Sequence, residues 1–227
     1  MKNNKKTAFL TTIFEMNKRY LQDFFKSLKN QTYKNFDIIV VNDGDIDFEK
    51  IVKLIDLRLN IIELKIDSSP AKNREYGINY CIDKKYDVLI FGDSDDYFKS
   101  NRIEKSLHFL KDSDIVINDL SLFDKNGIYE KKYLSHRLNN LEIVNFEFIK
   151  DKNIFGLSNT AIRLENIKKV NFNSKTVAVD WYFFKKLLKQ GLKAIFINET
   201  ETFYRQHEHN TTGLRVKNKK YCLWWEK

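Results

Sequence analysis

Cysteine, proline and glycine are scarce in this chain of 227 residues, which contains 2 Cys, 1 Pro and 7 Gly. The two cysteines, Cys81 and Cys222, lie far apart in the sequence, so they cannot build a disulfide framework or a four-thiolate zinc site. Such low cysteine usage is typical of a protein in a reducing cytosol. A flexible linker of the usual composition is also absent, because too little Gly and Pro is present to form one.

Long apolar runs are missing as well. No stretch approaches the roughly 20 residues of a membrane-spanning helix, and the basic residues 1–6 are not followed by the apolar core of a signal peptide. Hydrophobic residues nevertheless make up 42% of the chain and aromatic residues 14%. This is enough apolar material for a folded core, so the composition excludes wholesale disorder and predicts one domain with at most a small appendage.

The net charge is +9, from 40 Lys and Arg against 31 Asp and Glu. Nucleic acid, an anionic membrane or a phosphorylated substrate could each exploit that excess. Most of it is Lys scattered through the chain, without an Arg-rich run, which favours a solubilising surface over a nucleic-acid interface.

Residues 214–227 form a basic-aromatic tail, in which three lysines precede a pair of tryptophans. Basic side chains beside amphipathic rings suit the headgroup region of an anionic membrane. The alternative is that the tryptophans pack on the domain or in an oligomer contact. The residues concerned are Lys217, Lys219, Lys220, Trp224 and Trp225.

Short apolar runs alternate with helical patterns in the first half of the chain, and the alternation predicts an α/β fold with a mostly parallel central sheet flanked by helices. Strands are expected at 8–14, 36–41, 60–66 and 87–91, and helices at 20–30, 48–59 and 71–82. The second half is less regular, with strands expected at 114–117 and 193–197, helices at 146–150 and 178–189, and a surface loop at 130–140.

Polar residues lie at the ends of three of the predicted strands, and ligands of parallel sheets bind beyond the carboxyl ends of the strands. These residues are Thr11 and Thr12, Asp43, and Asp93 with Asp95. Paired carboxylates suit Mg²⁺ or Mn²⁺ shared with substrate phosphates, although such a pair by itself is more often a solvated turn. No glycine-rich phosphate loop is present, so charged side chains and a metal ion would have to hold the phosphates of a nucleotide.

Six short segments occur in a characteristic order, and together they resemble the motifs of family 2 glycosyltransferases over about residues 7–213. Two of them depart from the family pattern at a single position, since Glu75 replaces Asn and Val179 replaces Glu. A third, the Asp-Asp-Gly-Ser tetrapeptide, has Asn42 and Asp45 at its outer positions. The segments are residues 27–33, Asn42-Asp43-Gly44-Asp45, Arg74-Glu75-Tyr76-Gly77-Ile78, Asp93-Ser94-Asp95-Asp96, Val179-Asp180 and Tyr204-Arg205-Gln206-His207.

The resemblance implies a GT-A fold in one domain over 1–213, with a nucleotide-binding half at about 7–112 and a smaller acceptor-binding half at about 113–213. It further implies an inverting bacterial glycosyltransferase that uses Mn²⁺ or Mg²⁺. The enzyme would move a sugar, a hexose by type, from a nucleotide-sugar, expected to be a UDP-sugar, to a hydroxyl of a glycan or lipid-linked acceptor. Surface polysaccharide or lipooligosaccharide synthesis, in the cytoplasm or at the inner face of the cell membrane, is the context that the family suggests.

The same resemblance implies a role for each matching residue. Asp43 would bind the nucleotide base, Asp95 the metal ion, and Asp180 would be the general base. Each also has a structural interpretation: a turn residue, a solvated carboxylate, or an acid at a helix N-terminus. The full expected set is Thr11, Thr12, Asp43, Arg74, Asp93 and Arg205 for the nucleotide, Asp95, Asp93 and His207 for the metal, and Asp180 for catalysis.

Two other functions remain open at this level. A sugar-phosphate nucleotidyltransferase also uses an α/β sheet and acidic metal ligands, but it normally has a glycine-rich phosphate loop near the first strand. A basic, non-enzymatic nucleic-acid-binding domain would show a steep salt dependence of binding, whereas nucleotide-sugar binding would need a divalent metal.

Overall fold

A computed structural model describes residues 5–207 of the protein. The tail at 214–227 and Cys222 therefore lie outside the described residues. The strands are β1 (Thr7–Ile13), β2 (Asp37–Asn42), β3 (Ile61–Lys65), β4 (Val88–Phe91), β5 (Tyr97–Phe98), β6 (Ile115–Asp124), β7 (Gly127–Glu130), β8 (Ile143–Val144), β9 (Thr160–Arg163) and β10 (Ala194–Arg205). The helices are α1 (Lys18–Lys29), α2 (Glu49–Leu54), α3 (Pro70–Asp83), α4 (Arg102–Phe109), α5 (Phe146–Ile149) and α6 (Val179–Lys189), with 3₁₀ turns η1 (Leu134–His136) and η2 (Leu157–Asn159).

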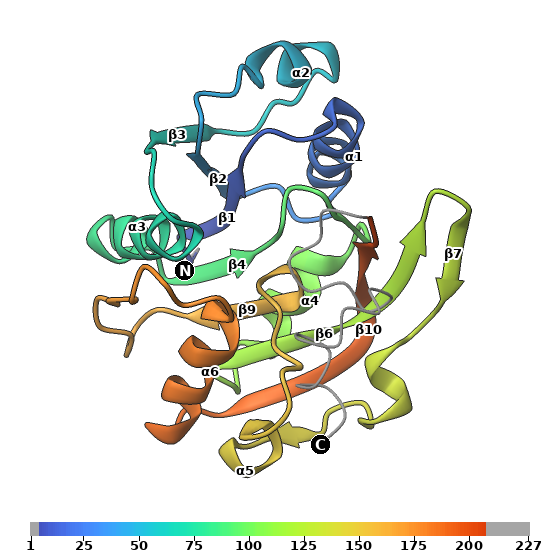
Figure 1. Ribbon diagram of the computed structural model, residues 1–227. Helices are drawn as coiled ribbons and strands as arrows, with labels where there is room; N and C mark the ends of the chain where they lie inside the picture. Colours follow the sequence, from blue (N-terminus) through green and yellow to red (C-terminus); the bar gives the residue numbers. More distant parts are fainter. Residues whose placement is uncertain (1–4, 208–227) are drawn as a thin grey trace.

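The strands of the sheet run in the order β3-β2-β1-β4-β9-β6-β10-β5, and Figure 1 shows this order from β3 to β10. β3, β2, β1 and β4 are mutually parallel, and β6 is parallel to β10. β9 lies between these two groups and is antiparallel to both of its neighbours. The predicted α/β architecture with a mostly parallel core is therefore confirmed.

Helices cover both faces of the sheet (Figure 1). Alternate residues of each strand point to opposite faces, so β1 sends Leu10 to one core cluster and Phe9 to the other. The first cluster packs beneath α3, α5 and α6, and the second beneath α1, α2 and α4.

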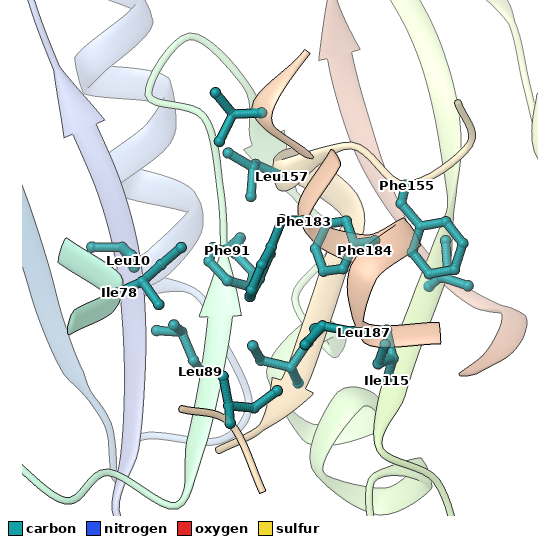
Figure 2. Packing of buried hydrophobic residues seen from close by; sticks show 14 of the residues in the cluster. Leu10, Ile78, Leu89, Phe91, Ile115, Phe155, Leu157, Phe183, Phe184 and Leu187 are labelled. Carbon is teal, nitrogen blue, oxygen red and sulfur yellow. The ribbon is translucent and has the colours of Figure 1, made fainter. Parts of the chain in front are cut away.

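The packing of α6 onto the sheet fixes the second half of the fold. Phe183, Phe184 and Leu187 point from α6 toward the sheet, where Phe91 of β4 lies against the two phenylalanine rings (Figure 2). The ring of Phe91 meets those of Phe183 and Phe184 edge-on, at centroid distances of 6.5 and 6.1 Å. Burial of large aromatic side chains is a dominant favourable contribution to such a core.

The ends of several helices follow from local sequence. The side chain of Asn17 accepts a hydrogen bond from the backbone N–H of Arg19 and caps α1. Ser69 caps α3, and Pro70 occupies its first turn. α2 is shorter than the predicted helix 48–59, because the chain takes a left-handed conformation at Asp56, with φ of 49°.

Several elements differ from the sequence-based expectation because polar residues occupy buried positions. α4 buries Arg102 and Ser106, so its apolar periodicity is weak. β6 continues well past the predicted 114–117 through buried Asn118 and Asp119. β10 likewise runs beyond 197 to Arg205, across a register shift. Four shorter strands, β5, β7, β8 and β9, were also not expected.

No helix in residues 5–207 is long and apolar enough to cross a membrane.

Gly92, directly after β4, is a point of very close packing. A Cβ atom there would lie 2.4 Å from Cζ of Phe9 and 2.6 Å from Cζ of Phe98. The space beside the strand end is thus filled by two rings from the core. Only a residue without a side chain lets the following segment leave β4 at this depth.

We predict that Gly92→Ala destabilises the protein by about 1–3 kcal/mol, because overpacking displaces the rings or the strand end. Urea unfolding monitored by far-UV circular dichroism measures this loss. Phe98→Leu removes one of the two clashing rings. The loss of stability in the double variant Gly92→Ala/Phe98→Leu should therefore be smaller than the sum of the losses in the two single variants. Wild-type stability of Gly92→Ala would show that the strand end can move freely.

Candidate active site

Three neighbouring parallel strands, β1, β2 and β4, end at the same edge of the sheet. The backbone N–H of Asp43 donates to the carbonyl of Ile13 at 2.8 Å, and that of Gly92 donates to the carbonyl of Leu10 at 3.1 Å. The residues that follow β2 and β4 are therefore held beside the end of β1. This brings the predicted polar strand ends together.

The two candidate threonines of β1 point to opposite faces. Thr12 is in register with Val41 of β2 and is partly exposed, on the face covered by α3. Thr11 is 2% exposed and lies on the face of Phe9. Thr12 is thus the threonine on the side of the strand-end residues, and its carbonyl accepts a hydrogen bond from Ser94 at 2.7 Å.

Asp43 is held by α3. Nδ2 of Asn73, a fully buried residue, donates to Oδ2 of Asp43 at 2.7 Å. The sequence patterns did not single out Asn73, because an Asn within a helix carries no signal of its own. Asp43 stays partly exposed at the end of β2.

Residues 93–96 form a tight turn in which Asp96 points inward. The N–H of Asp96 donates to the carbonyl of Asp93 at 3.2 Å, and Asp96 itself is 0% exposed. Its carboxylate accepts hydrogen bonds from the hydroxyl of Ser158 and, at 2.7 Å, from the backbone N–H of Arg205. Burial raises the pKa of Asp96 well above its usual range, and the charges of Asp95 and Asp93 add to the effect.

Asp95 lies beside His207, with 2.9 Å between its Oδ2 and the ring Nε2. Arg205 supports this pair, because its Nε donates to the carbonyl of Asp95 at 2.7 Å and its Nη2 to Asp23 at 2.8 Å. The guanidinium also lies over the ring of Tyr20, at 4.2 Å. Residues more than 100 apart in sequence thus converge on Asp95.

Arg74 of α3 interacts electrostatically with two carboxylates. Its Nη2 is 3.8 Å from Oδ1 of Asp93, and its charge lowers the pKa of both Asp93 and Asp180. Burial outweighs this influence and raises the pKa of Asp93 to about 6, with the charge of Asp95 adding to the rise. Arg74 therefore links the strand-end aspartates to the start of α6.

Asp180 occupies the first turn of α6. Its Oδ1 accepts a hydrogen bond from the backbone N–H of Trp181 at 2.8 Å, and Nδ2 of Asn153 approaches the same oxygen at 3.4 Å. Burial is the main cause that raises the pKa of Asp180 above its usual value. A carboxylate with a raised pKa, partly exposed at a helix N-terminus, is suited to accept a proton.

Arg102 lies beneath the turn formed by residues 93–96 and is 0% exposed. Its guanidinium donates to Oδ1 of Asn118 at 2.9 Å and to the carbonyl of Phe91 at 2.5 Å, and it lies 4.4 Å from the ring centre of Phe98. Burial lowers its pKa to about 9, against the opposing effect of Asp96 and Asp93. Sequence reasoning missed it, since an Arg in a polar helical segment normally faces solvent.

The donor atoms at this edge suit a hard divalent cation in part. Asp95 and His207 offer an oxygen and a nitrogen side by side, and Asp93 lies two residues from Asp95. Within residues 5–207, however, no cluster of three or more His, Cys, Asp or Glu side chains is arranged to hold a metal ion. The pair Asp95 and His207 fits a Mg²⁺ or Mn²⁺ ion whose remaining coordination positions are filled by water and substrate phosphate.

The fold is a mostly parallel α/β sheet of the GT-A type with an acidic edge at the strand ends. The chain from residue 8 to 170 matches the sequence profile described as glycosyl transferase family 2, and the protein belongs to that family. The prediction made from the six motifs is therefore confirmed. The match also decides against the nucleotidyltransferase and nucleic-acid-binding alternatives.

Two relatives illustrate the likeness. Over 109 residues the chain is 33% identical to an uncharacterized glycosyltransferase of Rickettsia bellii, a match that covers 46% of this chain but 15% of that relative. Over 195 residues it is 25% identical to WfaP of Escherichia coli, a UDP-Glc:α-D-GlcNAc-diphosphoundecaprenol β-1,3-glucosyltransferase, covering 85% of this chain and 74% of the relative.

Among solved structures, S. aureus TarS 1-349 in complex with UDP-GlcNAc shares the fold, with a TM-score of 0.70 and 17% identity. The likeness covers 91% of this chain and 60% of that one. At this level of identity it shows the GT-A architecture alone. The chain thus spans only part of the length of some of its relatives.

Proposed function

We propose that the protein is a metal-dependent, inverting glycosyltransferase that moves a sugar from a UDP-sugar to an acceptor hydroxyl. The observation that carries the proposal is the convergence of Asp43, Arg74, Asp93 and Asp95 at one edge of the sheet, with Asp180 at the near end of α6. Acidic and basic groups that would bind a nucleotide diphosphate thus lie beside a single carboxylate suited to proton removal. The family match supports the same reaction class.

Donor binding is assigned to the strand ends. The carboxylate of Asp43 would accept a hydrogen bond from the base, with Thr12 beside it, and Asp93 would contact the ribose. The cationic side chain of Arg74 faces this edge and would attract the diphosphate. Thr11 is not included in this assignment, since it is buried on the opposite face of the sheet from Thr12.

Asp95, Asp93 and His207 are the residues that would hold a Mn²⁺ or Mg²⁺ ion. When bound, the ion would supply positive charge to the diphosphate as negative charge builds on it. Arg205 is proposed to position the metal ligand Asp95, because its guanidinium donates a hydrogen bond to the backbone carbonyl of Asp95. Closure of His207 and Arg205 over the diphosphate, as the family resemblance implies, remains part of the proposal.

Asp180 is assigned the role of general base. It would take the proton from the acceptor hydroxyl as that oxygen forms a bond to the anomeric carbon and the bond to the UDP oxygen breaks. One displacement from the face opposite the leaving group inverts the anomeric configuration. The hydrogen bond from Trp181 N–H keeps Oδ1 occupied, so Oδ2 is the oxygen available for the proton.

The acceptor is proposed to be a glycan or a lipid-linked sugar in bacterial surface polysaccharide synthesis, in the cytoplasm or at the inner face of the cell membrane. The relative WfaP, as its name states, acts on a diphosphoundecaprenol-linked sugar, which supports this class of acceptor. Val144, Phe155 and the other buried residues of the half from 113 onward build the scaffold on which that acceptor would bind.

Asp95→Asn should weaken Mn²⁺-dependent UDP binding and lower the transfer rate by a factor of about 100 or more, because a charged ligand to the ion is lost. Titration calorimetry with and without Mn²⁺, beside a rate assay, measures both. Asp112→Asn, at an exposed position after α4, serves as the control and should behave as wild type. Unchanged turnover in Asp95→Asn would remove the metal-binding role.

Asp180→Asn should leave UDP-sugar affinity near that of the wild type and lower kcat by a factor of about 10²–10⁴, since only proton removal is lost. Donor titration and single-turnover transfer separate the two effects. Asp151→Asn, an exposed neighbour of Asn153, is the matched control. If affinity fell in step with the rate, Asp180 would belong to the donor site or to the scaffold.

The raised pKa of Asp180 predicts a pH dependence with a definite sign. The base acts only when ionised, so kcat should fall as the pH falls through its pKa, which lies above the ordinary 3.8. With saturating donor, the acid limb of kcat should therefore lie above pH 3.8. The residual activity of Asp180→Asn should lack that limb, and a limb of the same midpoint in both proteins would contradict the assignment.

A further inference from the structure

Asn73 is a fully buried polar residue that contacts Asp43, the residue proposed to bind the nucleotide base. Its Nδ2 donates to Oδ2 of Asp43 at 2.7 Å and approaches the carbonyl of Ser68 at 3.4 Å. Two oxygens thus surround the nitrogen end of the amide. The oxygen end, Oδ1, is buried and finds no hydrogen-bond donor in the described part of the chain.

The close approach of α3 to the sheet makes this contact possible. Gly77 lies one turn after Asn73 on the same face of the helix. A Cβ atom at Gly77 would lie 2.7 Å from Cδ1 of Leu10 and 2.9 Å from Cγ2 of Val41. Because α3 packs at this distance, the short side chain of Asn73 reaches the residue that follows β2.

The orientation of the amide has a consequence for Asp43. Nδ2 can only donate, so the carboxylate oxygen that it meets must accept. Oδ2 of Asp43 is therefore occupied. No hydrogen bond to Oδ1 of Asp43 is found among residues 5–207, and that oxygen is left as the acceptor for a ligand.

We propose that Asn73 is a positioning residue that sets the nucleobase preference of the enzyme, and this rests on the proposed role of Asp43 in binding the base. By holding Oδ2, Asn73 keeps a hydrogen-bond acceptor directed at the base. Uracil offers a donor at N3–H, whereas cytosine offers an acceptor at N3. The pair Asn73–Asp43 therefore selects uridine nucleotides over cytidine nucleotides.

The first test measures the affinities of UDP and CDP by calorimetry in the presence of Mn²⁺. Asn73→Ala should weaken UDP binding about tenfold or more while changing CDP binding little, so the ratio of the two affinities falls. Asn79→Ala is the matched control on the same helix. The amide of Asn79 exchanges two hydrogen bonds with the backbone of Val170, at 2.9 and 2.8 Å, so its loss should lower stability and leave the ratio unchanged.

The second test uses the direction of the hydrogen bond. In Asp43→Asn, the donor on Asn73 should hold the new carbonyl oxygen and turn the new NH₂ group toward the base, which favours the N3 acceptor of cytosine. Adding Asn73→Asp reverses the pair, because the carboxylate at 73 accepts from that NH₂ group. The carbonyl at 43 then faces the base, and the preference for UDP should return.

The outcomes separate this inference from the proposed function. A wild-type protein that binds neither nucleotide would overturn the donor class and the role of Asn73 together. A wild type that prefers UDP, with the same ratio in Asn73→Ala, would overturn the role of Asn73 alone. If Asn73→Ala does not fold, the comparison of Asp43→Asn with the double variant decides, and an equal preference for CDP in both would refute the role.

Discussion

The shape of the candidate site depends on the hydrogen bonds of one buried carboxyl group, that of Asp96. A polar group removed from water requires hydrogen-bond partners around it, and the carboxyl group of Asp96 has them in Ser158 and the backbone N–H of Arg205. Those donors belong to η2 and to the end of β10. One side chain thus joins the turn after β4 to two segments of the second half of the chain.

The position of Asp95 follows from that junction. With Asp96 turned inward, Asp95 faces His207, and Arg205 holds its carbonyl. Three carboxylates within four residues repel one another, and the buried guanidinium of Arg102 offsets part of the repulsion from inside the core. The acidic edge therefore consists of partly exposed side chains that can contact a ligand and buried side chains that hold them in place.

Close packing also positions the residues that are proposed to bind the nucleotide. Gly92 and Gly77 let the strand end and α3 approach their neighbours more closely than any side chain would allow. The close packing at Gly92 sets how deeply the turn at residues 93–96 lies in the fold. The close packing at Gly77 brings Asn73 within hydrogen-bond distance of Asp43. Residues that touch no substrate in the proposed reaction thus decide where the proposed binding residues lie.

The sequence by itself determined the alternation of strands and helices, the family, and the residues at the strand ends, because periodicity, caps and short motifs are local. It did not reveal α4, the length of β6 or the role of Arg102, since their buried polar side chains break the apolar pattern. Nor could it choose between Thr11 and Thr12, which differ only in the face to which the strand turns them. The partners of Asp43, Asp95 and Asp96 were decided by tertiary structure alone, because each contact joins residues that only the folded sheet and its helices bring within hydrogen-bond distance.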